Sequence, residues 1–271
     1  MNYTESVAKM YDNAAEYENN RLKQSPIHES EYLLTIDLLD HEILEYSHVL
    51  DLGSGTGIYS KYLVDSKNSK VALIDLSENE MNIFIENSRN IKNCVLWTKV
   101  KSAVEIEEIE SESFDSILVF GPLYHLPENA DRNRLLMNCF RILKRKGNIF
   151  CSYISPYRVY KDIFRDSSKL VNDANYMNNL KNGITFHTCN GIEAVQYRCW
   201  PSQAKAELEI CGFTIKKARS LEGVFAFMTK PEFVNIKEEK EKWLNILKEN
   251  CENQDIIGAS IHYLICGEKI C

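Results

Sequence analysis

The sequence predicts an α/β fold built on a doubly wound, mostly parallel sheet. Short runs that are apolar almost throughout alternate with segments of helical periodicity from about residue 48 to residue 154, as expected for parallel strands covered on both faces. A glycine-rich stretch follows the first run and opens into a helical segment, an arrangement by which α/β sheets hold nucleotide-like ligands. These two observations set the expected order of the elements.

The individual elements follow from periodicity. Residues 1–46 are expected to form an N-terminal helical cap, because apolar side chains recur there at helical spacing. Strands are then expected at 48–52, 71–76, 93–100, 114–120 and 147–154, with helices at 58–66, 78–90 and 132–146. After an interruption, the core resumes with a helix at 202–212, a strand at 213–221, a helix at 237–250 and a strand at 260–268.

The interruption, residues 155–200, is expected to be an insertion packed over the carboxyl edge of the sheet. It is rich in aromatic residues and asparagine and shows no clear succession of strand and helix. No internal repeat or low-complexity linker is evident, so residues 1–271 are expected to form a single domain. The aromatic residues of the insertion either line a binding pocket or pack the insertion itself: Tyr157, Tyr160, Phe164, Tyr176, Phe186, Tyr197 and Trp200.

The composition limits the kinds of partner. Lysine and arginine number 32 against 39 aspartates and glutamates, a net charge of -7 that repels nucleic acid and anionic lipid surfaces. We therefore expect neither as a partner. The nine cysteines include no C-x-x-C pair and mostly lie in apolar runs, which favours reduced, buried thiols. No apolar signal segment precedes the first helix, so a cytoplasmic protein is expected.

Two aspartates flank the glycine-rich stretch. Asp51 precedes Gly53 by two residues, and Asp75 ends the second strand, where a carboxylate can accept hydrogen bonds from both hydroxyls of a ribose. The spacing G-x-G-x-G differs from the dinucleotide pattern G-x-G-x-x-G, and the carboxylate of Asp51 would repel a pyrophosphate. The pattern suits a positively charged nucleoside such as S-adenosylmethionine (SAM). The alternative is a tight structural turn with two solvated aspartates.

The stretch VLDLGSGTG, followed by VALIDLS, resembles the first two motifs of class I SAM-dependent methyltransferases, and the resemblance covers residues 48–153. It implies a Rossmann-like sheet of seven strands whose last strand runs antiparallel. It also implies that the glycine loop cradles the methionine and ribose portion, and that the segment after the third strand faces the adenine, with serine in place of a common aspartate. The implied cofactor contacts are Tyr11, Arg21, Asp51, Gly53, Ser54, Gly55, Gly57, Asp75, Leu76, Ser102, Ala103 and Phe120, and the product would be S-adenosylhomocysteine (SAH).

The stretch FDSILVFGPLYHLPE is the second informative motif. The Gly121-Pro122 turn would aim Tyr124 and His125 at the sheet edge beside the cofactor. Gly121 lacks the side chain with which DNA and protein amide methyltransferases hold a target amine. GPLYHL resembles instead a group of bacterial small-molecule methyltransferases, as do YENNRL with the downstream Glu31, and GASIHYL.

Two residues of this motif are the candidates for catalysis. His125 is either a general base or a histidine that fixes the loop, and Tyr124 either contacts the acceptor or packs in the core. On the N-terminal helix, which closes over the cofactor in related enzymes, Arg21 either pairs with the methionine carboxylate or lies at the surface. The other histidines have no ligand-like spacing and are interpreted as structural: His28, His41, His48, His187 and His262.

The resulting hypothesis is in-line methyl transfer from SAM to a small-molecule acceptor. The protein would align the nucleophile with the methyl group and exclude water, a contribution that needs no metal or covalent intermediate. One alternative is an NAD-dependent oxidoreductase, which Asp51 and the glycine spacing disfavour; another is a non-catalytic SAM-binding module. The sequence leaves open the acceptor, the methylated atom and the oligomeric state.

Overall fold

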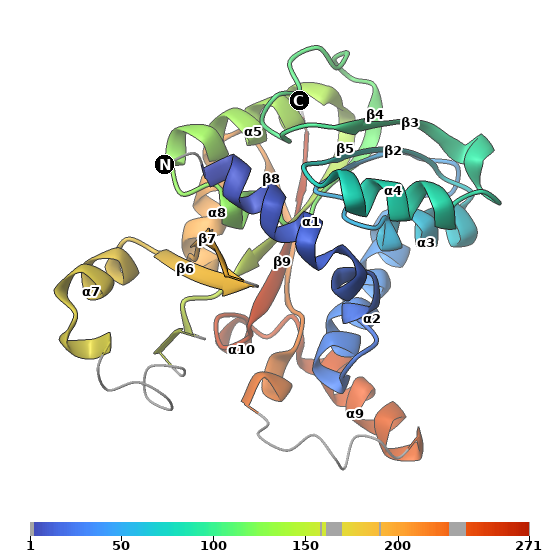
Figure 1. The fold of residues 1–271 in the computed structure, drawn as a ribbon. Helices are drawn as coiled ribbons and strands as arrows, with labels where there is room; N and C mark the ends of the chain where they lie inside the picture. Colours follow the sequence, from blue (N-terminus) through green and yellow to red (C-terminus); the bar gives the residue numbers. More distant parts are fainter. Residues whose placement is uncertain (1–2, 158, 161–169, 190, 228–236, 271) are drawn as a thin grey trace.

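The computed structural model describes residues 3–157, 159–160, 170–189, 191–227 and 237–270 (Figure 1). Seven strands form one sheet in the order β3-β2-β1-β4-β5-β9-β8. Their bounds are His48–Leu52 for β1, Lys70–Asp75 for β2, Val95–Val100 for β3, Phe114–Val119 for β4, Leu143–Ile154 for β5, Thr214–Ser220 for β8 and His262–Glu268 for β9. The strands β1 to β5 pair in parallel, and β9 pairs antiparallel with both β5 and β8. The predicted doubly wound sheet, with its antiparallel last strand, is confirmed.

Helices cover both faces of this sheet. On one face lie α2 (Pro26–Glu42), α3 (Ile58–Lys67), α4 (Glu78–Asn87) and α9 (Lys237–Asn250), whose apolar side chains share one core cluster with the strands. On the other face α5 (Asn129–Ile142), α8 (Pro201–Ile210) and the short α10 (Gln254–Ile257) share a second cluster. Both clusters include strand residues with no solvent exposure, because a parallel strand between two helical layers is buried on both sides.

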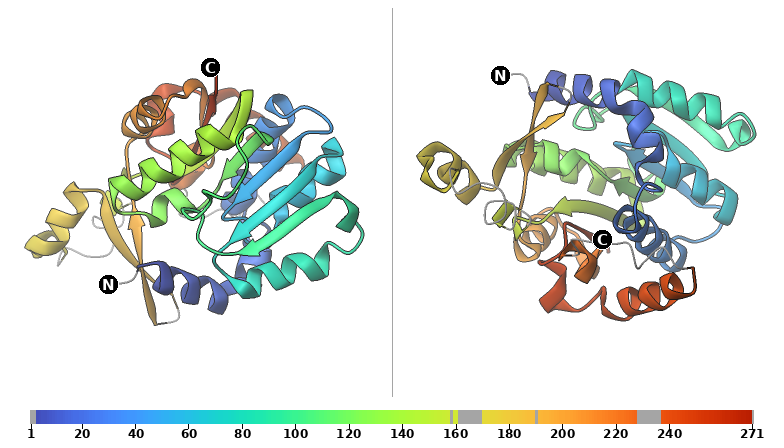
Figure 2. Two further views of the ribbon diagram at one scale, coloured as in Figure 1. Left: turned by 90° about the horizontal axis from the view of Figure 1, so that it is seen from above. Right: turned by 60° about the horizontal axis from the view of Figure 1, so that its bottom comes forward.

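The N-terminal helix α1 (Tyr3–Arg21) does not join either layer. It crosses the end of the sheet, beside the first turn of α4 and the strand β7 (Figure 2). It buries only Val7, Met10, Ala14 and Ala15. A small third cluster joins Val7 and Met10 to Ala194 of β7, so α1 packs as a roof rather than as a core helix.

The insertion contains regular structure that the sequence analysis did not predict. The strands β6 (Ile184–Cys189) and β7 (Ile192–Tyr197) form an antiparallel two-stranded sheet of their own, preceded by α7 (Ala174–Lys181). This hairpin stands beside α1 at the same end of the main sheet, and α7 projects beyond it (Figures 1 and 2). Short 3-10 turns complete the fold: η1 (Lys92–Cys94), η2 (Pro122–His125), η3 (Leu170–Asn172) and η4 (Gly223–Phe227).

No helix among the residues described here is long and apolar enough to cross a membrane.

Candidate active site

A cavity of about 550 Å³ lies at the carboxyl ends of β1, β2, β4 and β5. Parallel strands place the ends of successive β-α units at this edge, where α/β sheets bind their ligands. The helix α1 and the hairpin β6–β7 supply the opposite wall. The volume of the cavity is within the ~300–1,000 Å³ typical of small-molecule sites. Of the predicted site residues, the following line it: Tyr11, Arg21, Asp51, Gly53, Ser54, Gly55, Asp75, Leu76, Ser102, Ala103, Phe120, Tyr124 and His125.

The glycine loop forms the floor of this cavity. Gly53, Gly55 and Gly57 all have positive φ, a conformation that side-chain-bearing residues rarely adopt. A Cβ atom added to Gly55 would make an ordinary contact of 3.7 Å with the carboxylate of Glu80, its nearest neighbour, and Gly55 lines the cavity. Gly57 differs from the prediction, since it does not line the cavity and an added Cβ would lie 2.2 Å from the ring of Phe84. Its role in this structure is helix packing.

Asp75 sits at the end of β2 and is fixed by backbone donors. Its carboxylate accepts hydrogen bonds from Gly55 N at 2.7 Å and from Ser77 N at 2.8 Å. Burial raises the pKa of Asp75, and these backbone donors oppose the rise. The carboxylate is therefore held in one position at the edge of the cavity, as a ribose partner requires.

Asp51 is a buried acid at the end of β1. Burial raises its pKa to about 7, the hydrogen bond that Ser60 Oγ donates at 2.7 Å lowers it, and the nearby charge of Asp75 raises it. A carboxyl group with so high a pKa gains strongly from a cation placed beside it.

Glu80 is a third acid of this group, which the sequence analysis missed. It lies on the first turn of α4, and its carboxylate would be 3.7 Å from a Cβ on Gly55. Burial and the charges of Asp75, Glu18 and Asp12 raise its pKa to about 9. The sequence signal was weak, because Glu80 also fits the N3 position of a helix capped by Ser77.

Two observations indicate that a cationic nucleoside such as SAM fits this end of the cavity. Three buried acids converge there, and Arg21, the cation that acts on Glu80, is already paired with Glu18 and Glu31. An ammonium and a sulfonium would offset the negative charge of these acids. In addition, Ser54 Oγ is buried and has no hydrogen-bond partner among the described residues, although it lines the cavity. A buried hydroxyl of this kind is normally satisfied by a ligand or water.

The helix α1 is fastened over the cavity at two points. Asp12 accepts hydrogen bonds from Ser77 Oγ at 2.7 Å and from Asn79 N at 3.2 Å, which places a carboxylate at the N-terminus of α4. Tyr11 Oη forms a hydrogen bond of 2.9 Å with Nε2 of His125. The roof is therefore closed over both the β2 side and the β4 side of the cavity.

Both ring nitrogens of His125 are occupied. Nε2 is hydrogen-bonded to Tyr11 Oη, and Nδ1 lies 2.9 Å from the carbonyl oxygen of Val195 on the hairpin. Burial lowers the pKa of His125 to about 4, although the Val195 contact opposes the fall. A neutral imidazole that donates from Nδ1 and accepts at Nε2 satisfies both bonds. Of the two roles left open by the sequence, this geometry fits the histidine that fixes the loop.

Arg21 does not present a free guanidinium to the cavity. Its Nη1 and Nη2 atoms donate to the two carboxylate oxygens of Glu31 at 2.7 and 3.1 Å, and Nε donates to Glu18 at 2.8 Å. Of the two alternatives for Arg21, a pairing with the methionine carboxylate would have to share the guanidinium with two carboxylates of the chain itself. The bidentate fork instead ties α1 to α2.

The aromatic residues of the insertion divide into two groups. Tyr176 and Phe186 line the cavity. Tyr197 packs under the guanidinium of Arg132, and Tyr160 stacks on Trp200 with ring centroids 6.4 Å apart. Tyr157 is outside the lining, and Phe164 lies outside the described residues.

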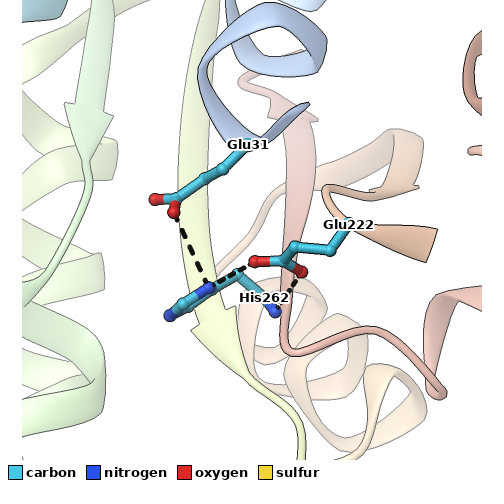
Figure 3. A group of neighbouring side chains, drawn as sticks. All are labelled: Glu31, Glu222 and His262. Carbon is cyan, nitrogen blue, oxygen red and sulfur yellow. Dashed lines mark hydrogen bonds and ion pairs between the residues drawn. The ribbon is translucent and has the colours of Figure 1, made fainter. Parts of the chain in front are cut away.

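The structure also brings together three residues that are far apart in sequence: Glu31, Glu222 and His262 (Figure 3). His262 and Glu31 line the cavity, whereas the sequence analysis interpreted His262 as structural. Nδ1 of His262 lies 2.6 Å from Glu222 Oε1 and 4.0 Å from Glu31 Oε2. The sequence gives no spacing signal for this group because α2, the loop after β8 and β9 each contribute one member.

Residues 50–151 match the family model of the methyltransferase domain. Curated relatives include the ubiquinone biosynthesis O-methyltransferases of Coxiella burnetii, 26% identical over 56% of this chain and 62% of that protein, and of Hahella chejuensis, 27% identical over 55% and 60%. The matched part thus spans about three fifths of the length of these relatives.

Solved structures resemble nearly the whole chain. The 1,6-didemethyltoxoflavin-N1-methyltransferase of Burkholderia thailandensis, solved with SAH, has a TM-score of 0.60 at 13% identity and covers 98% of this chain and 88% of its own. A SAM-dependent methyltransferase of Methanosarcina mazei has a TM-score of 0.59 at 17% identity, with coverages of 86% and 97%. The chain therefore has the Rossmann-like class I methyltransferase fold, and its residues 50–151 are similar to the methyltransferase domain.

Proposed function

We propose that this class I methyltransferase domain transfers the methyl group of SAM to a small-molecule acceptor held at the β4–β9 side of the cavity. The observation that carries the proposal is the group of buried acids, Asp51, Asp75 and Glu80, around a glycine loop at the carboxyl edge of the sheet. The match to the methyltransferase domain over the same segment supports it.

The chain's residues have distinct tasks in this proposal. Asp75, held by two backbone donors, accepts hydrogen bonds from the ribose hydroxyls. Asp51, ionised by the cationic ligand, places negative charge at the methionine end beside Glu80, and Leu76, Ser102 and Ala103 form the wall for the adenine. SAM supplies the electrophilic methyl group.

The roof explains how the reaction would be kept from water. Tyr11 and Asp12 fasten α1 over the cavity from both sides, and His125 ties the hairpin to the same point. Closing a site in this way aligns the reactants and strengthens the electrostatic contacts within it. His125 acts here as a positioning residue, and Tyr124 as a wall of the acceptor site.

A small acceptor is supported by the size and enclosure of the site. One cavity of about 550 Å³ holds both cofactor and acceptor, and the hairpin closes its far side. Similar proteins include a ubiquinone biosynthesis O-methyltransferase and a 1,6-didemethyltoxoflavin-N1-methyltransferase, and the second was solved with 1,6-didemethyltoxoflavin bound. A cytoplasmic location is part of the proposal, since seven cysteines are free thiols, as in reducing compartments: Cys94, Cys139, Cys151, Cys199, Cys211, Cys251 and Cys266.

Calorimetric titration with SAM and SAH tests the cofactor assignment. We expect micromolar binding of SAM that Asp75→Ala weakens at least tenfold, which is about 1.4 kcal/mol. Asp65→Ala, at an exposed aspartate of α3, is the matched control and should bind as the wild type does. NADH is titrated in parallel, since its binding in place of SAM would support the oxidoreductase alternative. If folded protein binds neither SAM nor SAH, the proposed function is wrong.

A further inference from the structure

We propose that His262, oriented by Glu222, is the general base for the acceptor, and that the acceptor is a small aromatic compound with a hydroxyl group. This inference rests on the proposed function and adds the chemistry of its second substrate.

The first support is the way in which Glu222 is held. Its Oε2 accepts hydrogen bonds from Ser260 Oγ and from the backbone N of His262, both at 2.7 Å, and its side chain is 1% exposed. Its Oε1 therefore has one position, 2.6 Å from Nδ1 of His262. A carboxylate so placed favours the tautomer with a proton on Nδ1 and leaves Nε2 as the acceptor nitrogen. Figure 3 shows Nε2 pointing away from Glu222.

The second support is the position of His262 in the fold. It begins β9 and pairs with Ile154 at the carboxyl end of β5, so it lies at the same sheet edge as the glycine loop. It lines the shared cavity, and its ring centroid is 6.5 Å from that of Tyr124, which follows β4. The strand order β2-β1-β4-β5-β9 puts the ribose partner at one side of the cavity and this histidine at the other.

The charges around His262 suit a group that gains a proton during the reaction. Glu222 and Glu31 face its Nδ1 side, while the guanidinium of Arg21 forms a bidentate pair with Glu31. With a neutral His262, this group of four residues carries one net negative charge. An imidazolium formed there is compensated within a few ångströms, which is the arrangement that makes a histidine an effective base.

The same contacts argue against a metal ion at Glu31, Glu222 and His262, although their atoms lie within 4.8 Å of one another. Nδ1 of His262 and Oε1 of Glu222 are joined by a hydrogen bond, and Oε2 of Glu222 already accepts from two donors. Both carboxylate oxygens of Glu31 accept hydrogen bonds from Arg21. A divalent cation would have to displace these donors and lie beside a permanent positive charge. We therefore expect methyl transfer to be independent of added metal ions, which the experiment below tests with EDTA.

The acceptor class follows from what a neutral Nε2 can do. It can accept the hydrogen of a hydroxyl group, whereas a carboxylate acceptor would face the uncompensated negative charge of this group. Rings line this cavity: Tyr17, Tyr59, Phe120, Tyr124, Tyr176 and Phe186. His28, which also lines it, has a buried Nδ1 with no partner among the described residues and can hydrogen-bond a second polar substituent. These features fit an uncharged, substituted phenol.

The step balances without a further reactant. The acceptor oxygen forms its bond to the methyl carbon as the bond from that carbon to the sulfonium sulfur breaks, and the electron pair of that bond remains on sulfur. The hydroxyl proton passes to Nε2 of His262. The products are the methyl ether, SAH and the imidazolium, which loses its proton to solvent after release.

The experiment measures transfer of labelled methyl from SAM to a panel of phenol, catechol, benzoate and benzylamine, with the wild type and three variants. We expect phenols to be methylated and benzoate and benzylamine to be left unchanged. His262→Gln should lower kcat by about 100-fold or more, because general bases typically contribute that much. His41→Gln, the same substitution at an exposed histidine of α2, should retain wild-type rates.

Glu222→Gln tests the positioning role through the pH profile at saturating SAM. Removing its charge should shift the acid limb of kcat to lower pH, since the imidazolium loses a partner; a purely structural residue would change the rate without moving the limb. The other groups that face His262 are Arg21, His28, Glu31 and Tyr124, and they remain unchanged in this variant. Nitrogen-15 NMR of the imidazole checks the Nδ1-protonated tautomer directly in the folded protein.

The outcomes separate the two levels of the proposal. Failure to bind SAM overturns the proposed function. Normal SAM binding by His262→Gln, with the phenol rate lost, supports the inference and shows that the variant is folded. Methylation of benzylamine or benzoate instead of phenols, no turnover of any panel member by SAM-binding wild type, or a rate that EDTA abolishes and Mg²⁺ or Zn²⁺ restores, overturns the inference.

Discussion

The affinity for SAM should fall as the pH falls from 7 to 5.5, because Asp51 becomes protonated in the free protein. Burial places the pKa of Asp51 at about 7, and a cationic ligand favours its ionised form. If binding restores an ordinary aspartate pKa near 4, the affinity varies as 1/(1 + 10^(7−pH)), a loss of about 16-fold or ~1.6 kcal/mol between pH 7 and 5.5. The affinity falls at low pH because SAM is a cation, and protonated, neutral Asp51 attracts a cation less than ionised Asp51 does.

Calorimetry at pH 7 and pH 5.5, below the titration of the ligand's amino group, measures this change. In buffers of different ionisation enthalpy the same titrations report release of nearly one proton at pH 5.5. Asp51→Asn should bind weakly at both pH values, with little pH dependence. Asp65→Asn, on the surface of α3, should retain the wild-type dependence.

The contribution of Glu80 can be separated in the same experiment. Its pKa of about 9 keeps it protonated in the free protein throughout this pH range. Should the ligand ionise Glu80 as well, the loss of affinity would be steeper than tenfold per pH unit, and Glu80→Gln would restore the single-proton slope. Equal wild-type affinity at pH 7 and 5.5, or an unchanged slope in Asp51→Asn, would refute the electrostatic reasoning.

Three further predictions concern the loop and the roof. Without ligand at pH 8, Asp51→Asn should be more stable to urea than the wild type, by up to about 4 kcal/mol. The reason is that the pKa of Asp51 is higher in the folded than in the unfolded protein, so the wild type loses stability as the pH rises from 4 to 7. Equal or lower stability of the variant contradicts this. Gly57→Ala should destabilise the fold by about 2 kcal/mol or more, because φ is positive and the new Cβ would lie only 2.2 Å from the ring of Phe84, whereas Gly55→Ala should fold but lose SAM binding in calorimetry. Tyr11→Phe should cost about 1 kcal/mol in urea unfolding through its lost bond to His125 and weaken SAM several-fold; unchanged affinity would show that this bond does not hold the roof.

The central sheet could be predicted from the sequence because its signals are local. Each parallel strand is a short apolar run, and the turn after β1 carries glycines whose conformations the neighbouring residues require. The hairpin β6–β7 was missed although its segments alternate in polarity around an Asn-Gly pair, the strongest short hairpin signal.

The cofactor end of the site was predictable for the same reason. Asp51, Asp75 and the glycines lie within one β-α-β unit, so their spacing in sequence largely fixes their spacing in space. Arg21 lines the cavity, but its pairing with Glu31 was not predicted. Glu31 lies ten residues further on in the next helix, and the angle between α1 and α2 cannot be read from periodicity.

His262 could not be found by spacing, since the property that distinguishes it from His125 arises from tertiary contacts. Both histidines lie in the cavity wall, yet tertiary contacts occupy both nitrogens of His125 and only Nδ1 of His262 has a hydrogen-bond partner among the described residues. The motif histidine thereby gains a structural role, because a buried imidazole with a pKa of about 4 stays neutral and holds three elements together. The histidine on β9 retains one nitrogen for chemistry, and a carboxylate from a loop 40 residues away defines which nitrogen that is. A motif can thus mark the site while the proton acceptor comes from the strand that the sheet order places beside it.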